Sequence, residues 1–171
     1  MLQDAPVIVR SRRFKALMTT FPSGVAVVTT MGLDGTPLGL TCTSVCSVSL
    51  EPPLLLVCID NRSHTLSTIV DRGMFAVNLL HEGGRDTAGA FAANVPDRFA
   101  GISWQSTPHL ELPCLPVDAH AVAECRLHAS FLSGDHTIIV GEVAAVERLG
   151  PGRPLMYGLR HYEVWPARAY E

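Results

Sequence analysis

The chain has 171 residues and a mass of 18.4 kDa, which is long enough for one domain with its own hydrophobic core. Hydrophobic residues make up 47% and charged residues 17%, a composition that excludes a disordered chain. A net charge of −3 and a pI near 6.1 argue against nucleic-acid binding. We expect residues 1–171 to form a single domain, with residues 1–10 as a flexible N-terminal arm.

The spacing of apolar residues and the positions of turn residues predict the elements. In chain order these are a helix over 11–21, strands over 25–30, 38–45 and 54–59, a helix over 63–70, a strand over 74–80, a helix over 85–93, loop over 95–116, and strands over 119–132, 137–148 and 160–165. Ser11 and Ser63 are the expected helix caps. Mostly short connections between strands favour an antiparallel barrel with a few short helices.

Neither a targeting segment nor a membrane span is evident in the sequence. Residues 1–10 do not resemble a signal peptide, and no stretch approaches the roughly 18 apolar residues of a span. The five cysteines form no CxxC pair. We therefore expect reduced thiols, no metal site, no membrane contact and a cytoplasmic protein.

Several common catalytic motifs are absent. The sequence has no GxGxxG after a strand, no GxxxxGK[ST] loop and no GxSxG elbow. Its acidic residues are scattered singly, so paired-carboxylate hydrolysis has no centre. Any chemistry must come from a cofactor, or from residues that spacing alone does not reveal.

Hydroxyl side chains are concentrated in residues 39–49. A regular strand would place Thr41, Thr43, Ser47 and Ser49 on one face and Ser44 on the other. Buried hydroxyls need hydrogen-bond partners. Two interpretations stay open: a half-exposed strand hydrated by water, or a polar wall for a flat heterocycle.

Residues 60–65, Asp-Asn-Arg-Ser-His-Thr, lie between a predicted strand and a predicted helix. Free N–H groups at a helix start, two hydroxyls and the Arg62 guanidinium suit a phosphate. An ordinary helix cap beside a solvated arginine is the alternative.

Residues 133–136, Ser-Gly-Asp-His, join the two longest predicted strands. Gly134 and Asp135 are common turn residues, so turn formation alone can explain them. Histidine is the side chain whose charge changes near neutral pH, which makes His136 a candidate functional residue.

Together these segments resemble the short-chain flavin reductases, the reductase components of two-component flavin-dependent monooxygenases. The resemblance covers about residues 12–165. The matching pieces are residues 21–30, 39–44, 47–55, 61–65, 75–80, 91, 98–99, 134–136, 141–143, 154–157 and 162. It implies an FMN-binding split barrel, usually a homodimer. It also implies an enzyme that reduces exchangeable FMN or FAD with NADH or NADPH and passes the reduced flavin to a monooxygenase.

The same resemblance implies a set of cofactor contacts. The isoalloxazine ring is expected beside Thr41, Cys42, Thr43 and Ser44. The ribityl chain is expected beside Ser47, and the phosphate beside Arg62, Ser63 and Thr65. Further expected cofactor contacts are Asp60 and Tyr162, and the nicotinamide is expected beside His136.

Three alternatives use the same barrel. The first is an oxidase similar to pyridoxamine-phosphate oxidase, with a resident flavin and a basic substrate pocket. The second is a non-catalytic flavin- or haem-binding protein. The third is a purely structural dimeric barrel, which the hydroxyl run of residues 41–49 disfavours. Oxidation of NADH that depends on added flavin separates the reductase from all three.

Overall fold

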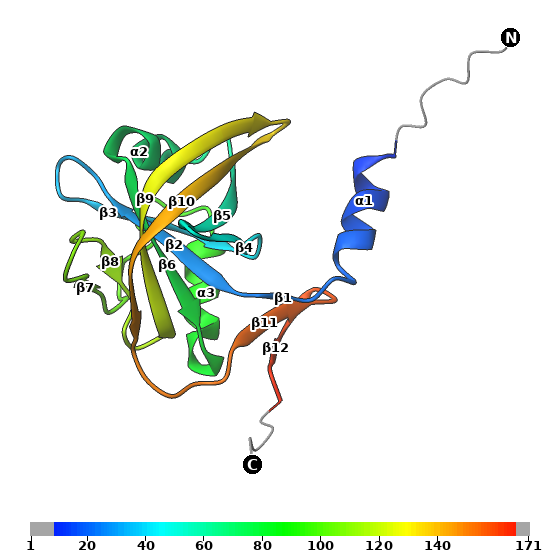
Figure 1. The fold of residues 1–171 in the computed structure, drawn as a ribbon. Coiled ribbons are helices and arrows are strands. Elements are labelled where there is room, and N and C mark those ends of the chain that lie inside the picture. The colour runs from blue at the N-terminus through cyan, green and yellow to red at the C-terminus, as the bar shows by residue number, and fades with distance from the viewer. Residues whose placement is uncertain (1–8, 167–171) are drawn as a thin grey trace, which may run out of the picture.

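The computed structural model describes residues 9–166, which are mainly β-strand (Figure 1). The helical elements are α1 (Ser11–Met18), α2 (His64–Arg72), η1 (Glu82–Gly84) and α3 (Arg85–Ala92). The first six strands are β1 (Ser23–Gly24), β2 (Ala26–Met31), β3 (Pro37–Cys42), β4 (Cys46–Leu50), β5 (Pro53–Asp60) and β6 (Met74–Leu80). The others are β7 (Gln105–Ser106), β8 (Pro113–Cys114), β9 (Ala119–Ser133), β10 (His136–Arg148), β11 (Leu155–Gly158) and β12 (His161–Val164).

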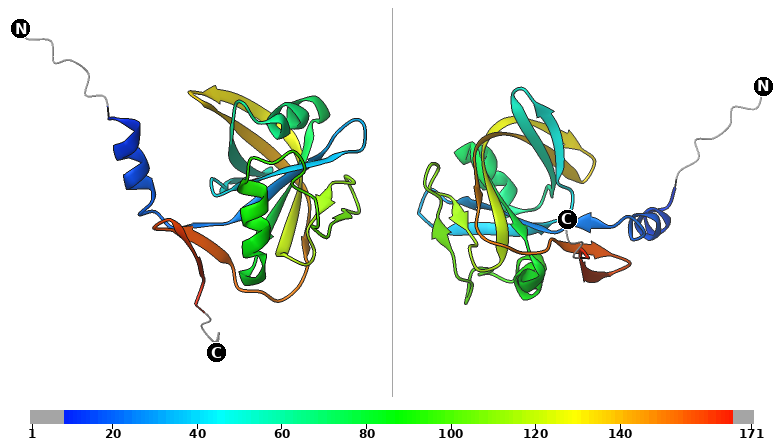
Figure 2. Two further views of the ribbon diagram at one scale, coloured as in Figure 1. Left: turned by 180° about the vertical axis from the view of Figure 1, so that it is seen from behind. Right: turned by 60° about the horizontal axis from the view of Figure 1, so that its bottom comes forward.

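Seven strands form one antiparallel sheet in the order β3-β2-β6-β9-β10-β5-β4. The sheet curls into a barrel, which Figure 2 shows from two further sides. The sheet edges, β3 and β4, are consecutive in sequence. The Ser44 hydroxyl between them accepts a hydrogen bond from the Cys58 N–H (3.0 Å) and donates one to the Cys58 carbonyl (3.2 Å). This side chain therefore ties the β3–β4 connection to β5.

Strand β2 is buried on both faces because its alternate residues enter two different cores. Ala26 and Val28 face the barrel interior, together with Ile69 of α2. Val25, which precedes β2, and Val27 pack in a second cluster with residues of α3. The near-continuous apolar run of residues 25–28 follows from this double burial. Helices α2 and α3 are held against the barrel by these two clusters.

Most predicted elements are confirmed, including the hairpin of β9 and β10. The strand predicted over 38–45 is wrong beyond Cys42, because the chain leaves the sheet there and re-enters it as β4 at the opposite edge. The helix predicted over 11–21 ends at Met18, and its N-cap is Arg10 rather than Ser11. The loop predicted over 95–116 contains the short β7 and β8 pair. Residues 1–8 of the predicted N-terminal arm lie outside the described residues.

Helix α1 projects from the barrel, and both Figure 1 and Figure 2 show it well away from the sheet. None of its residues is buried. Phe14 and Leu17 are 56% and 64% exposed, and Phe21 just beyond the helix is 66% exposed. An isolated helix of this length is unstable in water, so an apolar face of this kind needs a surface to pack on.

Candidate functional site

A cavity of about 880 Å³ lies between β3, the start of α2 and the loop after α3. Its walls are residues 36–41 on and before β3, residues 58–60 and 62–65 from the end of β5 into α2, and residues 91–92 and 94–99 from the end of α3 into the following loop. His136 completes the lining. A volume of this size falls within the roughly 300–1,000 Å³ typical of small-molecule sites.

Gly39 lets α3 approach the β3 wall. A Cβ at this position would lie 2.8 Å from Cε1 of Phe91 and 3.1 Å from the Val28 carbonyl. Phe91 is buried and packs edge-to-face on Phe99, with ring centroids 4.8 Å apart. This small residue and two aromatic rings give the cavity an apolar inner surface suited to a flat ring.

The hydroxyl-rich segment of residues 39–49 lies only partly in the cavity wall, and its other residues lie in the barrel core or on the surface. Of the predicted ring contacts, Thr41 lines the cavity, and its hydroxyl donates to the Ala88 carbonyl of α3 at 2.6 Å. Cys42 faces the barrel core, where burial raises the pKa of its thiol. Thr43 is exposed, Ser44 is bonded to Cys58, and Ser47 is exposed on β4; none of these three lines the cavity.

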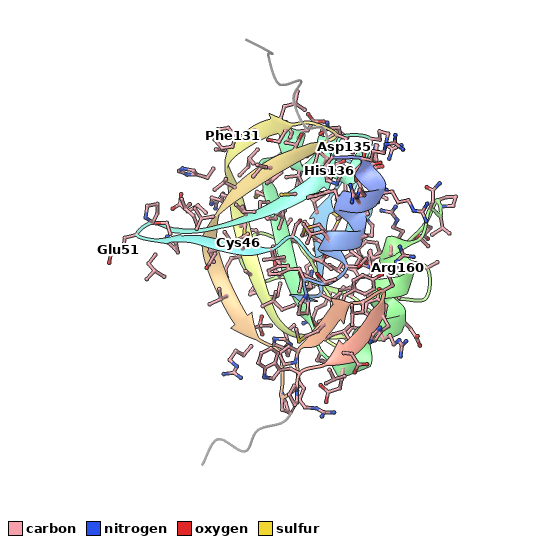
Figure 3. All side chains as sticks on the ribbon, turned by 90° about the vertical axis from the view of Figure 1, so that its right-hand side faces the viewer. Cys46, Glu51, Phe131, Asp135, His136 and Arg160 are labelled. Carbon is pink, nitrogen blue, oxygen red and sulfur yellow. The ribbon has the colours of Figure 1, made fainter. Side chains whose placement is uncertain are left out.

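The expected shared face for Thr41, Thr43, Ser47 and Ser49 is therefore wrong. The physical reason is the break at residues 43–45, which sends the two halves of the segment to opposite edges of the sheet. Figure 3 shows Cys46 and Glu51 on the β4–β5 hairpin, which projects from the barrel. Flavin contact by Thr41 and by the other predicted side chains of this segment stays a prediction.

Residues 60–65 contain a two-point ion pair between Arg62 and Asp60, followed by the start of α2. Arg62 Nε and Nη2 donate to the two oxygens of Asp60 at 3.0 and 2.7 Å. The guanidinium holds the pKa of the Asp60 carboxyl well below its usual range. All predicted members of this segment line the cavity, but the Arg62 side chain is 90% exposed and already paired with a carboxylate.

The helix start itself offers free donors. Ser63 is the N-cap of α2, as predicted, but its hydroxyl makes no capping hydrogen bond. The N–H groups of His64 and Thr65 belong to the first helical turn, where no intrahelical acceptor exists. Thr65 lines the cavity although it is only 3% exposed. These donors and the helix dipole together suit a phosphate.

His136 faces Asp60 across the β5–β10 pair. Its Nδ1 lies 2.8 Å from the Asp135 carboxylate, which accepts the hydrogen bond and whose pKa is lowered by it. Figure 3 shows Asp135 and His136 together at the end of the barrel. The side chain of Asn61 binds the Gly134 carbonyl and the Thr137 hydroxyl. These hydrogen bonds thus join the β9–β10 turn to residues 60–65.

Tyr162 lies elsewhere. It packs against Tyr157 on the small β1-β11-β12 sheet, at 5.2 Å between ring centroids, with Arg85 at 5.7 Å. Burial raises the pKa of its phenol. The cavity of one chain does not include Tyr162, and its contact with a cofactor stays a prediction.

Sequence reasoning gave no role to the loop after α3, which supplies much of one wall. Asn94, Val95, Pro96, Asp97, Arg98 and Phe99 all line the cavity. Arg98 is half-buried there, and its guanidinium donates to the carbonyls of Gly39 and Ala93, both at 2.9 Å. The sequence signal for this wall is the pair Arg98 and Phe99, a charged residue next to an aromatic one within a stretch that contains Pro and Gly.

Within residues 9–166 no cluster of three or more potential metal ligands occurs, and no helix has the length and apolar character to cross a membrane. All five cysteines are free thiols.

A mainly β split barrel with a cavity large enough for a nucleotide defines the class of this protein. Residues 18–166 match the family described as the flavin reductase like domain. The chain is 47% identical over 166 residues to a flavin reductase (NADH) of Kitasatospora aureofaciens, covering 96% of this chain and 87% of that protein. It is 48% identical to a flavin reductase (NADPH) of Lentzea aerocolonigenes, covering 88% of each.

The fold agrees with a solved relative. The structure is similar to that of the NADH:FAD oxidoreductase SgcE6 of Streptomyces globisporus in complex with NAD and FAD fragments, with a TM-score of 0.86 and 30% identity. The match covers 96% of this chain and 99% of that one. The chain belongs to the flavin reductase-like domain family, which confirms the expected family and the split-barrel fold.

Proposed function

We propose that this chain is an NAD(P)H:flavin oxidoreductase that reduces FMN or FAD and releases the reduced flavin to a partner monooxygenase. The observation that carries the activity is 47% identity to a flavin reductase across 96% of the chain. Relatives include the reductase subunit HsaB of a flavin-dependent monooxygenase, which supports a partner of that class. We further propose that residues 1–171 form one flavin reductase-like domain of a cytoplasmic protein.

The cavity residues fit this activity without a side-chain nucleophile. Bound NAD(P)H and flavin would supply the chemistry, a hydride transfer from the nicotinamide to the flavin, and the cavity residues would hold the two rings close together. The Gly39 and Phe91 wall accepts a flat ring, and the donors of residues 63–65 bind a phosphate. The Asp135 carboxylate accepts a hydrogen bond from the imidazole of His136. We assign this imidazole, which lines the cavity, a position beside the nicotinamide.

Initial rates of NAD(P)H loss at 340 nm test the activity. Purified protein is assayed without flavin, with FMN and with FAD, in each case with NADH and with NADPH. We expect turnover that saturates with added flavin and a preparation that loses flavin on gel filtration. Turnover without added flavin, from tightly retained cofactor, would instead indicate the oxidase, and no turnover would indicate a binding protein.

Replacing both Ser63 and Thr65 with alanine is expected to raise the KM for FMN about 30-fold. The change removes two hydroxyl donors at the start of α2, each contributing on the order of 1 kcal/mol. The KM for NADH at saturating flavin should change little. Ser67→Ala is the matched control, because Ser67 lies on the same helix, is exposed and outside the cavity lining, and its hydroxyl donates to the His64 carbonyl at 2.9 Å. An unchanged KM for FMN would sink the phosphate assignment.

Replacing His136 with alanine is expected to raise the KM for NAD(P)H roughly fivefold, the effect of losing one hydrogen bond. The KM for flavin should stay close to the wild-type value. His128→Ala is the control, since His128 is an exposed residue of β9 that does not line the cavity. A selective loss of flavin affinity in His136→Ala would refute the placement beside the nicotinamide.

We also propose a homodimer in which the apolar face of α1 packs on a second copy of the chain. Phe14, Leu17 and Met18 lie on one side of the helix at spacings of three and four residues, and all three are exposed. The anchor of this segment to the rest of the chain includes the hydrogen bond from the Leu159 N–H to the Thr19 carbonyl. A partner surface would remove the exposed apolar side chains from water.

A further inference from the structure

Arg98 stands out among the charged residues of the cavity because it has no acidic partner within residues 9–166. Its Nε donates to the Ala93 carbonyl and its Nη1 to the Gly39 carbonyl. A guanidinium carries five N–H donors, so three are left for a ligand. The neighbouring Asp97 carboxylate is directed to the Phe99 N–H at 2.9 Å instead.

The contrast with Arg62 indicates which arginine is free to bind an anion. Arg62 is almost fully exposed and forms a two-point ion pair with Asp60. Arg98 is half-buried on the cavity wall, and among residues 9–166 its guanidinium bonds only to neutral carbonyls. Partial burial of an unpaired charge is unfavourable, and an anionic ligand would remove that penalty.

The backbone contacts also hold the guanidinium in place before any ligand binds. Ala93 follows α3 and Gly39 lies on β3, so Arg98 connects two walls of the cavity. A fixed planar fork loses little conformational entropy on binding and matches two phosphate oxygens at once. A lysine at this position would provide the charge without the two-point geometry.

On the basis of the function proposed above, we propose that Arg98 binds the diphosphate of a dinucleotide in the cavity. The donors at Ser63 and Thr65 belong to a different wall, so a second phosphate group can be held there. FMN has a single phosphate, whereas FAD and NAD(P)H each contain a diphosphate. Arg98 therefore distinguishes a dinucleotide from a mononucleotide.

Steady-state kinetics of Arg98→Gln test this assignment, because glutamine removes the charge and keeps a neutral donor. If the diphosphate belongs to FAD, the KM for FAD rises about tenfold while that for FMN is unchanged. If it belongs to the nicotinamide nucleotide, the KM for NADH rises about tenfold with either flavin. Arg98→Lys is expected to restore only part of the loss. Arg126→Gln is the control, since Arg126 is exposed on β9 outside the cavity.

Equal KM values in Arg98→Gln and wild type would overturn the assignment, as would an equal rise for FMN and FAD with no change for NADH. A second measurement needs no variant: ADP, which carries a diphosphate, is expected to inhibit the wild-type enzyme about tenfold more strongly than adenosine. Equal inhibition by the two compounds also overturns it. If only the role of Arg98 is wrong, the wild-type enzyme still reduces flavin. If the proposed function is wrong, the wild-type protein shows no flavin-dependent turnover.

Discussion

Replacing Asn78 with alanine is expected to lower the free energy of unfolding by about 3 kcal/mol. Asn78 is fully buried on β6. Its Nδ2 carries two hydrogens, which the Val27 carbonyl, the Thr29 hydroxyl and the Pro113 carbonyl share as acceptors at 3.1 to 3.3 Å. Its Oδ1 accepts from the Leu115 N–H at 2.9 Å. This amide joins the barrel to the segment around β8.

The large effect follows from what the substitution leaves behind. Alanine would strand the buried Leu115 N–H and weaken the contacts of the Pro113 carbonyl, and each unsatisfied buried group costs about 1–3 kcal/mol. Leu115 belongs to the core cluster that includes Phe91 and Phe99, which line the cavity. We therefore expect weaker flavin binding as well.

Urea unfolding at one fixed protein concentration measures the change in stability. Thr30→Val is the matched control, because Thr30 is equally buried on the same sheet but makes one side-chain hydrogen bond, to the Met74 carbonyl at 2.9 Å. The control should lose about 1 kcal/mol. If Asn78→Ala lowers the free energy of unfolding no more than the control does, Asn78 does not join the barrel to the β8 segment in the way described.

Replacing Leu17 with glutamate is expected to raise the dissociation constant of the proposed homodimer at least about 100-fold. Leu17 is 64% exposed at the centre of the apolar face of α1. In a symmetric dimer the substitution introduces two charges, and burying an unpaired carboxylate in an apolar contact is strongly unfavourable. The helix is too short to be stable alone, so it should also lose order.

Analytical ultracentrifugation over a range of concentrations measures this shift from dimer to monomer. Leu33→Glu is the control: Leu33 is 82% exposed at the β2–β3 turn and lies outside α1. We expect the control to stay dimeric. A wild-type chain that is monomeric at all concentrations would refute the dimer, and a Leu17→Glu dimer of wild-type affinity would refute the role of α1.

The cavity combines residues that are distant along the chain. Asp60 meets His136 through the pairing of β5 and β10, and Gly39 meets Arg98 through a hydrogen bond between a strand and a loop. The Asn61 side chain then fixes the position of the β9–β10 turn relative to α2. The proposed binding functions thus depend on strand register as much as on residue type.

Local patterns were sufficient for most of the barrel. A short, nearly continuous apolar run predicted β6 with its observed bounds, and the turn at Gly134 and Asp135 predicted the long hairpin. The segment of residues 60–65 was also readable, because a helix start next to hydroxyls and arginine has a local signature. These features depend on neighbouring residues, whose preferences the sequence displays directly.

The sequence by itself determined the strand-rich barrel, the family and the helix start that suits a phosphate. Only the tertiary structure decided that residues 39–49 divide between two sheet edges, that Asp60 neutralises Arg62, and that Arg98 enters the cavity. Each of these depends on pairing between distant segments or on which charge finds a partner. Spacing along the chain carries no information on such contacts, because they are set when the sheet closes into a barrel.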